Sequence, residues 1–491
     1  MQRSHATVSV QLWILALGIL AAFLFGASVR PLLGYSGRHS AAKPLPLSSV
    51  LCARTSPPAA VAAAAPDVAT DIPPEQLWVP LVEPRDSYRA AADFYPYARP
   101  PPPGFERWLE YARPRQCLLG RYDRLEADLA PFRDPADPGR RSITRAALAR
   151  AAELHSTVFY HVRDGRVSFD AVEELQAVAR EYLQVLDRIA PHLPDIDFVV
   201  NTLDTPRTLP GEGTFAERLA TTCANASAEL TQRGELHGYV INSLRDGSDV
   251  QRELLPVISM TKIASCHGDL VAPPWYHIQH LAGKRGQGLG LETDVCRPGA
   301  PENLAWHQRV PHLFFRGSTT GGLVREGTPY QRFHRHRLVK LAADDPRMDV
   351  GFSAYLQCEP EVCAEMEAQY GRKPYVPERE AYRHRFLMVV DGNSFSSRLL
   401  WTMSSGSLVF RSHLFTEWYE DRIQPSVHYL PVRLDYADLS ERLDWALTHD
   451  AEAHVIAQQA AIVARLHLRI EDVECYWLRL LTEYAALLQP E

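Results

Sequence analysis

Residues 382–411 read YRHRFLMVVDGNSFSSRLLWTMSSGSLVFR, and they indicate the fold of the chain. Within them, Phe386–Val390 is a short apolar run that is typical of a buried strand. Turn residues follow it, Ser394 is predicted to cap a helix over 396–404, and Leu408–Phe410 begins a second strand. A strand, a polar turn, a helix and a strand form the βαβ unit of a parallel sheet.

The polar turn of this unit is a candidate anion site. The N-terminus of a helix presents backbone N–H groups and a positive dipole end to a bound anion. Arg398 lies one turn into the predicted helix, where its guanidinium can reach the same anion. The stretch therefore predicts a site for the diphosphate of a nucleotide.

The composition is that of a globular protein with more than one domain. The chain has 491 residues, 46% of them hydrophobic and 23% charged, which allows a sizeable core. The formal net charge of −7 does not favour nucleic-acid binding, so no nucleic-acid partner is expected. Among the eight cysteines, Cys358 and Cys363 are close enough in sequence to form either a small disulfide loop or a pair of buried thiols.

An apolar segment near the start of the sequence is long enough to cross a bilayer. Val8–Val29 is an almost unbroken apolar run of roughly 22 residues, so residues 1–30 are predicted to form a signal anchor, with a cleaved signal peptide as the alternative. Residues 31–104 are rich in alanine, proline and serine and are predicted to form a stem. The sequon at Asn225 and the even number of cysteines favour a lumenal position for the rest of the chain.

Beyond the stem, strand and helix signals alternate twice, which predicts two α/β domains, 105–305 and 306–491. Besides the opening stretch, strands are predicted at Asp197–Asn201, Tyr239–Leu244, Val257–Ile263, His312–Phe315 and Val427–Val432. Helices are predicted at 122–132, 143–154, 169–190, 332–343, 438–449, 451–466 and 472–488, with an amphipathic helix starting at Phe105. The basic residues of the helix 332–343 are expected to form a solvated face.

Asp204 is a candidate catalytic carboxylate. It lies just beyond the end of the predicted strand Asp197–Asn201, where open α/β sheets bind their ligands. A carboxylate at this place can accept a proton from an attacking hydroxyl, and a turn aspartate is the alternative interpretation.

The segment Arg316–Gly321, RGSTTG, is a candidate loop for a phosphate or a sugar. It follows a predicted strand and offers hydroxyls, backbone N–H groups and one guanidinium, and Arg325 follows on its far side. Gly/Ser/Thr loops are common in proteins, so this loop has to be combined with other signals. Histidines and cysteines do not form a full ligand set at accepted zinc spacings, so no metal site is expected.

Eight sequence blocks, taken together and in order, resemble glycosyltransferase family 90. They are PPPGFERW (101–108), DLAPFR (128–133), DFVVNTLD (197–204), FFRGSTTG (314–321), VVDGNSFSSR (389–398), SGSLVF (405–410), EWYEDRIQPSVHYLPV (417–432) and ECYWLRLL (474–481). The resemblance runs from about residue 100 to residue 488. It implies a GT-B architecture of two facing Rossmann-like domains, behind the anchor and the stem, with a UDP-sugar as the donor.

The resemblance also implies roles for individual residues. Asp204 matches the catalytic base of an inverting transfer that needs no metal and no other cofactor. Cys475 matches a cysteine that is tied to the N-terminal region, and Cys117 is the candidate partner. The residues that match the donor-binding loop and turn are Arg316, Ser318, Arg325, Asn393, Ser394, Phe395, Ser396, Ser397 and Arg398.

The departures from the family pattern leave the substrates open. His384 and Ser405 occupy positions where the animal members have a cysteine pair. The resemblance therefore implies transfer of a sugar, xylose or glucose, to a glycan, a glycolipid or a protein, at a Golgi or endoplasmic-reticulum membrane. Two other functions are weighed against it: a glycoside hydrolase that pairs Asp204 with Asp391 or Glu417, and a catalytically silent sugar-binding protein.

Overall fold

The computed structural model of the chain describes residues 95, 97, 99–120, 122–133, 142–213, 217, 250–264, 266–282 and 304–489. All of them belong to one unit of the chain, Ile72–Glu491. The predicted membrane segment at 8–29, most of the predicted stem, Asn225 and the predicted strand at 239–244 lie outside the described residues.

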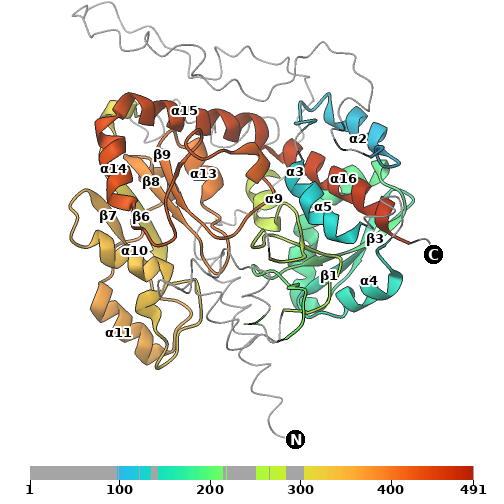
Figure 1. The fold of residues 1–491 in the computed structure, drawn as a ribbon, viewed down its shortest axis with the longest axis horizontal. Coiled ribbons are helices and arrows are strands. Elements are labelled where there is room, and N and C mark those ends of the chain that lie inside the picture. The colour runs from blue at the N-terminus through green and yellow to red at the C-terminus, as the bar shows by residue number, and fades with distance from the viewer. Residues whose placement is uncertain are drawn as a thin grey trace, which may run out of the picture. The chain divides into compact units, whose positions relative to one another are not determined.

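Five parallel strands form a sheet around the apolar run of the opening stretch (Figure 1). Their order in the sheet is β10-β9-β8-β6-β7, so the chain runs from β6 outward to β7 and then returns to the other side of β6 as β8. The direction of strand addition therefore reverses between β6 and β8. The strands are β6 (Val310–Ser318), β7 (Met348–Ala354), β8 (His384–Val390), β9 (Leu408–Ser412) and β10 (Leu430–Pro431).

Both faces of this parallel sheet are buried. Phe315 and Phe386 contribute to a large core on one face, whereas Phe314 and Leu387 pack in a second cluster. Burial on both faces explains why β8 is apolar at every position from Phe386 to Val390. The helices of this half are α10 (His334–Ala342), α11 (Pro360–Tyr370), α12 (Glu378–Ala381), α13 (Leu399–Ser404), α14 (Leu439–Thr448) and α15 (Asp450–His467).

The first half of the chain forms a mixed sheet with the order β2-β1-β3-β4-β5. Strand β1 is antiparallel to both β2 and β3, whereas β3, β4 and β5 are parallel. The two sheets confirm the predicted α/β class; the GT-B arrangement and the domain bounds stay predictions. The strands are β1 (Thr157–Arg163), β2 (Arg166–Asp170), β3 (Ile196–Asn201), β4 (Val257–Ser259) and β5 (Leu270–Val271).

A helix from the end of the sequence completes the helical layer beside the first sheet. This helix, α16 (Ile470–Leu487), packs against α2, α5 and α9 (Figure 1). Its Trp477 is fully buried, and the indole N–H donates to the carbonyl of Pro273 at 3.1 Å. The other helices of this half are α2 (Phe105–Ala112), α3 (Asp123–Leu129), α4 (Arg145–Ala152), α5 (Gln176–Ile189) and α9 (Trp275–Ala282).

Two predictions of local structure are wrong. The long helix expected over 169–190 begins only at Gln176, because Phe169 lies in β2, where it pairs with Tyr160 of β1. Ser394 does not cap a helix, because α13 begins at Leu399 and has Arg398 at its N-cap position. The helix ends at Ser404, as predicted, and Gly406 follows it with a φ of 74°, a conformation that glycine adopts without steric cost.

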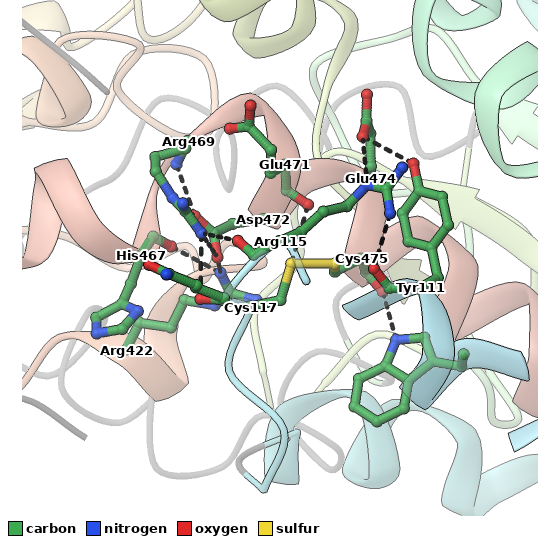
Figure 2. The surroundings of a disulfide bond; sticks show 12 residues. Tyr111, Arg115, Cys117, Arg422, His467, Arg469, Glu471, Asp472, Glu474 and Cys475 are labelled. Atoms are coloured by element: carbon green, nitrogen blue, oxygen red, sulfur yellow. Dashed lines mark hydrogen bonds and ion pairs between the residues drawn. A yellow bond between two sulfur atoms is a disulfide. The ribbon is translucent and has the colours of Figure 1, made fainter. Parts of the chain in front are cut away.

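Two disulfides confirm the pairings that the sequence suggested. Cys117, which follows α2, is bonded to Cys475 of α16 across 358 residues, and Cys358 is bonded to Cys363. Figure 2 shows that polar contacts surround the long-range bond. The Trp108 indole N–H donates to the carbonyl of Cys475 at 3.0 Å, and the Tyr111 hydroxyl donates to Glu474 Oε2 at 2.8 Å.

None of the helices in the described ranges combines the length and the apolar character that crossing a bilayer requires. The predicted anchor at 8–29 is not among these residues, so it stays a prediction.

The two disulfides are expected to differ in their effect on stability. Replacing Cys117 and Cys475 by serine should lower the free energy of unfolding by about 2–4 kcal/mol, because the bond closes a loop of 358 residues in the unfolded chain. The matched double variant at Cys358 and Cys363, which opens a loop with a separation of 5, should lose less. Urea unfolding followed by tryptophan fluorescence measures both, and an equal loss would contradict this expectation.

Candidate functional site

The loops that follow β6 and β8 meet where the strand order reverses. Ligands of open α/β sheets bind in the crevice at the carboxyl ends of the strands at such a point. The backbone N–H of Gly321, in the loop after β6, donates to Oδ1 of Asn393, in the turn after β8, at 3.1 Å. Gly321 has a φ of 133°, and a Cβ on it would lie 2.6 Å from His334 Cε1 of α10 and 3.2 Å from the carbonyl oxygen of Gly392 in the other loop, so this position requires glycine.

Asp204 comes to the same place from the other sheet. It follows β3, and its Oδ2 accepts a hydrogen bond of 3.0 Å from Nδ2 of Asn393. The Ser394 hydroxyl donates to the backbone carbonyl of Asp204. Burial raises the pKa of the Asp204 carboxyl above its ordinary value, and the hydrogen bond from Asn393 lowers it in part. The structure thus brings the predicted base and the predicted donor turn into direct contact.

The Asn201 side chain holds the loop that carries Asp204. This asparagine is fully buried at the end of β3. Its Nδ2 donates to the carbonyl of Thr205 at 2.8 Å and to Ser259 Oγ at 3.1 Å, and its Oδ1 accepts from the Leu203 N–H at 3.1 Å. The side chain therefore replaces the strand partners that the backbone loses where the chain turns.

Among the described residues, the Arg398 guanidinium makes no hydrogen bond and no close ion pair, and Glu378 is the carboxylate whose charge acts on it. Its Cζ lies 4.5 Å from the centroid of the Phe315 ring, and a Cβ on Gly317 would lie 3.3 Å from its Nη2. Burial lowers the pKa of Arg398 to about 10. A desolvated positive charge at the switch point is stabilised by a bound anion.

A second guanidinium, that of Arg335 in α10, ties the two loops together. Its Nε donates to the carbonyl of Asp391 at 2.8 Å, and its Nη1 donates to the carbonyl of Ser318 at 3.0 Å and to Thr320 Oγ1 at 2.6 Å. The pKa of Arg335 falls to about 9, first through burial and then through the charge of Arg398. All three partners are neutral oxygens, and the negative charge of Asp391 opposes the lowering of the Arg335 pKa only in part.

Arg316 lies on the other face of the sheet. Its Nη2 contacts both carboxylate oxygens of Asp349 on β7 at 2.6 and 2.7 Å, and its Cζ lies 4.9 Å from the Phe314 ring centroid. Neighbouring residues of a strand point to opposite faces, so Phe314 with Arg316 and Phe315 with Arg398 lie on opposite sides of β6. Arg316 is therefore engaged in holding β6 to β7.

The remaining predicted donor residues are placed as follows. Phe395 stacks on Tyr276 of α9, with ring centroids 5.0 Å apart and planes at 5°. The Ser318 hydroxyl lies 3.1 Å from Thr320 Oγ1. Ser396 is buried, Ser397 is exposed, and Arg325 is exposed in a turn where its backbone N–H donates to Thr328 Oγ1.

The carboxylates that a hydrolase would pair with Asp204 have other hydrogen-bonding partners. Asp391 Oδ2 accepts from the backbone N–H groups of Leu414 and Phe415 at 2.7 and 3.2 Å. Glu417 is 2% exposed and accepts from the hydroxyls of Tyr276 and Tyr419. Burial raises the pKa of Glu417 to about 8. Both groups therefore stabilise the fold around the site.

Sequence reasoning missed Arg335 and Tyr276. The basic residues of the helix that carries Arg335 were expected to be solvated. This holds for the exposed Arg332 and Lys340, but it is wrong for His334, Arg335 and His336, which are at most 6% exposed. The adjacent RGSTTG and DGNS loops offer many backbone carbonyls, and a neighbouring basic helix is a natural source of donors for them. Within the described ranges, histidine, cysteine and acidic side chains do not gather in groups of three that could hold a metal ion.

Comparisons with known proteins agree with the geometry. A sequence profile described as Glycosyl transferase family 90 matches residues 253–491. "Protein O-glucosyltransferase 2" from Danio rerio is 25% identical over 372 residues, 74% of this chain and 62% of that protein. "Protein O-glucosyltransferase 3" from Homo sapiens is 26% identical over 235 residues, 47% of this chain and 42% of that protein.

A further human relative, "Protein O-glucosyltransferase 1", is 28% identical over 248 residues, which is 48% of this chain and 58% of that protein. The chain thus spans 62%, 42% and 58% of the lengths of these three relatives, in each case less than two thirds.

Glu417 should make the stability of the fold depend on pH. Its carboxyl keeps a proton in the folded state up to a pH of about 8, whereas in the unfolded chain it loses that proton near its ordinary pKa of 4.5. Its contribution to the free energy of unfolding is therefore complete below pH 4.5 and is lost as the pH rises to about 8. The Glu417→Gln variant should lack this loss.

The test is denaturant unfolding of both proteins from pH 5 to pH 8. Relative to the wild type, Glu417→Gln should gain stability across this range by a few kcal/mol, since each pKa unit corresponds to about 1.4 kcal/mol. The exposed Glu110→Gln serves as the control. A difference between wild type and Glu417→Gln that does not change with pH would contradict the assignment.

Proposed function

Since residues 253–491 form a glycosyltransferase family 90 domain, we propose that this chain transfers a sugar from a UDP-sugar to a hydroxyl group of an acceptor. The contact between Asp204 and Asn393 carries the proposal, because it places a carboxylate from one sheet against the anion-binding turn of the other. A nucleophile, a base and a charged leaving group have to meet in such a reaction, and this junction supplies groups for the last two.

The proposed reaction is a single displacement at the anomeric carbon of the donor sugar. The acceptor oxygen forms the new glycosidic bond while the bond between the sugar and the UDP oxygen breaks. Asp204 accepts the proton that the acceptor hydroxyl gives up, and UDP leaves with the electron pair. Attack opposite the leaving group inverts the configuration at that carbon. Burial of Asp204 keeps its basicity above that of an exposed aspartate.

The donor diphosphate is proposed to bind beside Arg398. Its guanidinium and that of Arg335 bring two positive charges to the crevice, and the charge on UDP grows as the bond to the sugar breaks. Backbone N–H groups and hydroxyls of Ser318–Gly321 and of the turn Asn393–Ser397 complete the proposed site. In this arrangement Arg316 supports the site by fixing β6 to β7, and Arg325 is proposed to contact the donor from the far side of the loop.

The names of the relatives favour glucose as the sugar and a protein as the acceptor. Xylose and glycan or glycolipid acceptors remain the alternatives from the sequence. The two disulfides support an oxidising compartment, because such bonds form and persist in secreted and lumenal proteins. We therefore propose a lumenal location in the Golgi or the endoplasmic reticulum, with the apolar segment 8–29 as the anchor and no metal requirement.

Asp204→Asn should abolish transfer while leaving UDP affinity unchanged. Loss of a general base costs about 10²–10⁴-fold in rate, and the amide has the size of the carboxyl that it replaces. UDP release with a panel of UDP-sugars measures turnover, and calorimetry measures UDP binding. Full activity of the variant would show that Asp204 is not the base. Turnover without UDP release would indicate a hydrolase, and absence of UDP binding by the wild type would indicate a silent protein.

Arg398→Ala should weaken UDP binding by about 10- to 100-fold, because it removes charge-assisted hydrogen bonds to the diphosphate. The exposed Arg372→Ala removes the same side chain from a surface ion pair and should leave the dissociation constant unchanged. Calorimetric titration with UDP and with uridine separates the two halves of the ligand, since only the affinity for UDP should fall. Equal UDP affinity in Arg398→Ala and wild type would rule out the diphosphate role.

A further inference from the structure

We propose that Asn393 is a positioning residue for the base: its side-chain amide orients the Asp204 carboxylate and holds it in the ionised form that accepts a proton. This inference rests on the transferase function proposed above. It gives Asn393 a different task from that of a donor ligand, which the sequence pattern had suggested for it.

The orientation of the Asn393 amide follows from its two partners. Its Oδ1 accepts the backbone N–H of Gly321 at 3.1 Å, and its Nδ2 donates to Asp204 Oδ2 at 3.0 Å. A flipped amide would bring its NH₂ group against the Gly321 N–H and its oxygen against the carboxylate, and both contacts would be repulsive. The backbone of the loop after β6 thus fixes which end of Asn393 faces the base.

The hydrogen bond from Asn393 is suited to a catalytic base, because a base has to be ionised before it can accept a proton. An amide N–H stabilises the ionised carboxylate and cannot transfer its proton to it, whereas an acidic side chain in the same place could do so. The bond also restrains one oxygen of Asp204, while the Ser394 hydroxyl restrains the backbone of the same residue. Two neighbouring residues of one turn therefore hold the carboxylate in place.

Charged groups of the surrounding elements, Arg335 and Arg398 included, are not what shifts the pKa of Asp204, because its shift comes from burial and from hydrogen bonds. Asp391, in the same turn as Asn393, has its carboxylate on two backbone N–H groups, and Arg207, beyond Asp204, donates to the carbonyl of His155 at 2.8 Å. Burial raises the pKa of Asp204, and hydrogen bonds from Asn393 and from its own backbone lower it. Around α9, Glu417 is hydrogen-bonded to Tyr276. Among the described residues, Asn393 is therefore the side chain that lowers the pKa of Asp204.

The experiment compares the pH dependence of kcat/KM for UDP-sugar transfer in the wild type, Asn393→Ala and Asn393→Asp. Activity is lost as the pH falls through the pKa of the base, so this acid limb reports Asp204 in the free enzyme. Asn393→Ala removes a hydrogen bond to the carboxylate and should move the limb upward by about one pH unit.

Asn393→Asp distinguishes this role from a purely structural one. Its carboxylate keeps an acceptor for the Gly321 N–H but places a second negative charge against Asp204, which raises the pKa of the pair further. The acid limb should therefore rise in the order wild type, Asn393→Ala, Asn393→Asp. If Asn393 only held the loops together, Asn393→Asp would lose less activity than Asn393→Ala, and the acid limbs of all three proteins would coincide. Either result would overturn the inference.

Three controls complete the design. Each variant is checked by circular dichroism and by UDP binding, and Asn393→Ser, which should shift the limb in the same direction, replaces any variant that fails to fold. Gln184→Ala removes an exposed amide from α5 and should not move the limb. Asp204→Asn distinguishes failure of the proposed function from failure of this inference. If Asp204→Asn is fully active, the proposed function fails. If it is inactive and the acid limbs of the Asn393 variants do not move, only this inference fails.

Discussion

The reversal of strand order between β6 and β8 is the constraint on which the site depends. In a parallel sheet every connection returns on one face or the other, so the loops of the two strands where the order reverses diverge and leave a crevice. Here these loops carry glycines and hydroxyls, and a buried arginine of α10, Arg335, holds them at a fixed distance. The position of the proposed anion site is thus set by topology first and by side chains second.

The parts of the fold that the sequence predicts are those in which burial is uniform. Phe386–Val390 is buried on both faces and is apolar throughout, so its strand could be recognised. The hairpin of β1 and β2 was not recognised: β1 alternates between buried and partly buried positions, β2 has no fully buried position, and Phe169 was assigned to the helix that follows. Helix α10 was recognised, but whether its basic side chains face solvent or the core is decided by tertiary packing.

The site shows the same division. Asp204 could be located because the end of a strand has a fixed meaning in an open sheet. Its partner could not, since Asn393 lies 189 residues further along the chain. Arg316 and Arg398 lie on opposite faces of the sheet, because they contact Phe314 and Phe315, whose side chains point to opposite sides of β6. That Phe314 and Phe315 point to opposite sides can be predicted from the sequence once the strand is assumed. Pairings between distant loops have no such local signal.

The position of α16 has a consequence for how the protein is made. Trp108 and Cys475, which are in contact in the folded state, are 367 residues apart, so the ribosome releases α2, α5 and α9 long before the helix that covers them. Until then the first half presents apolar surface that has no cover, the situation in which nascent chains aggregate or recruit chaperones. The first half therefore completes its folding only once α16 has been synthesised and docks, and once the thiols of Cys117 and Cys475 are oxidised.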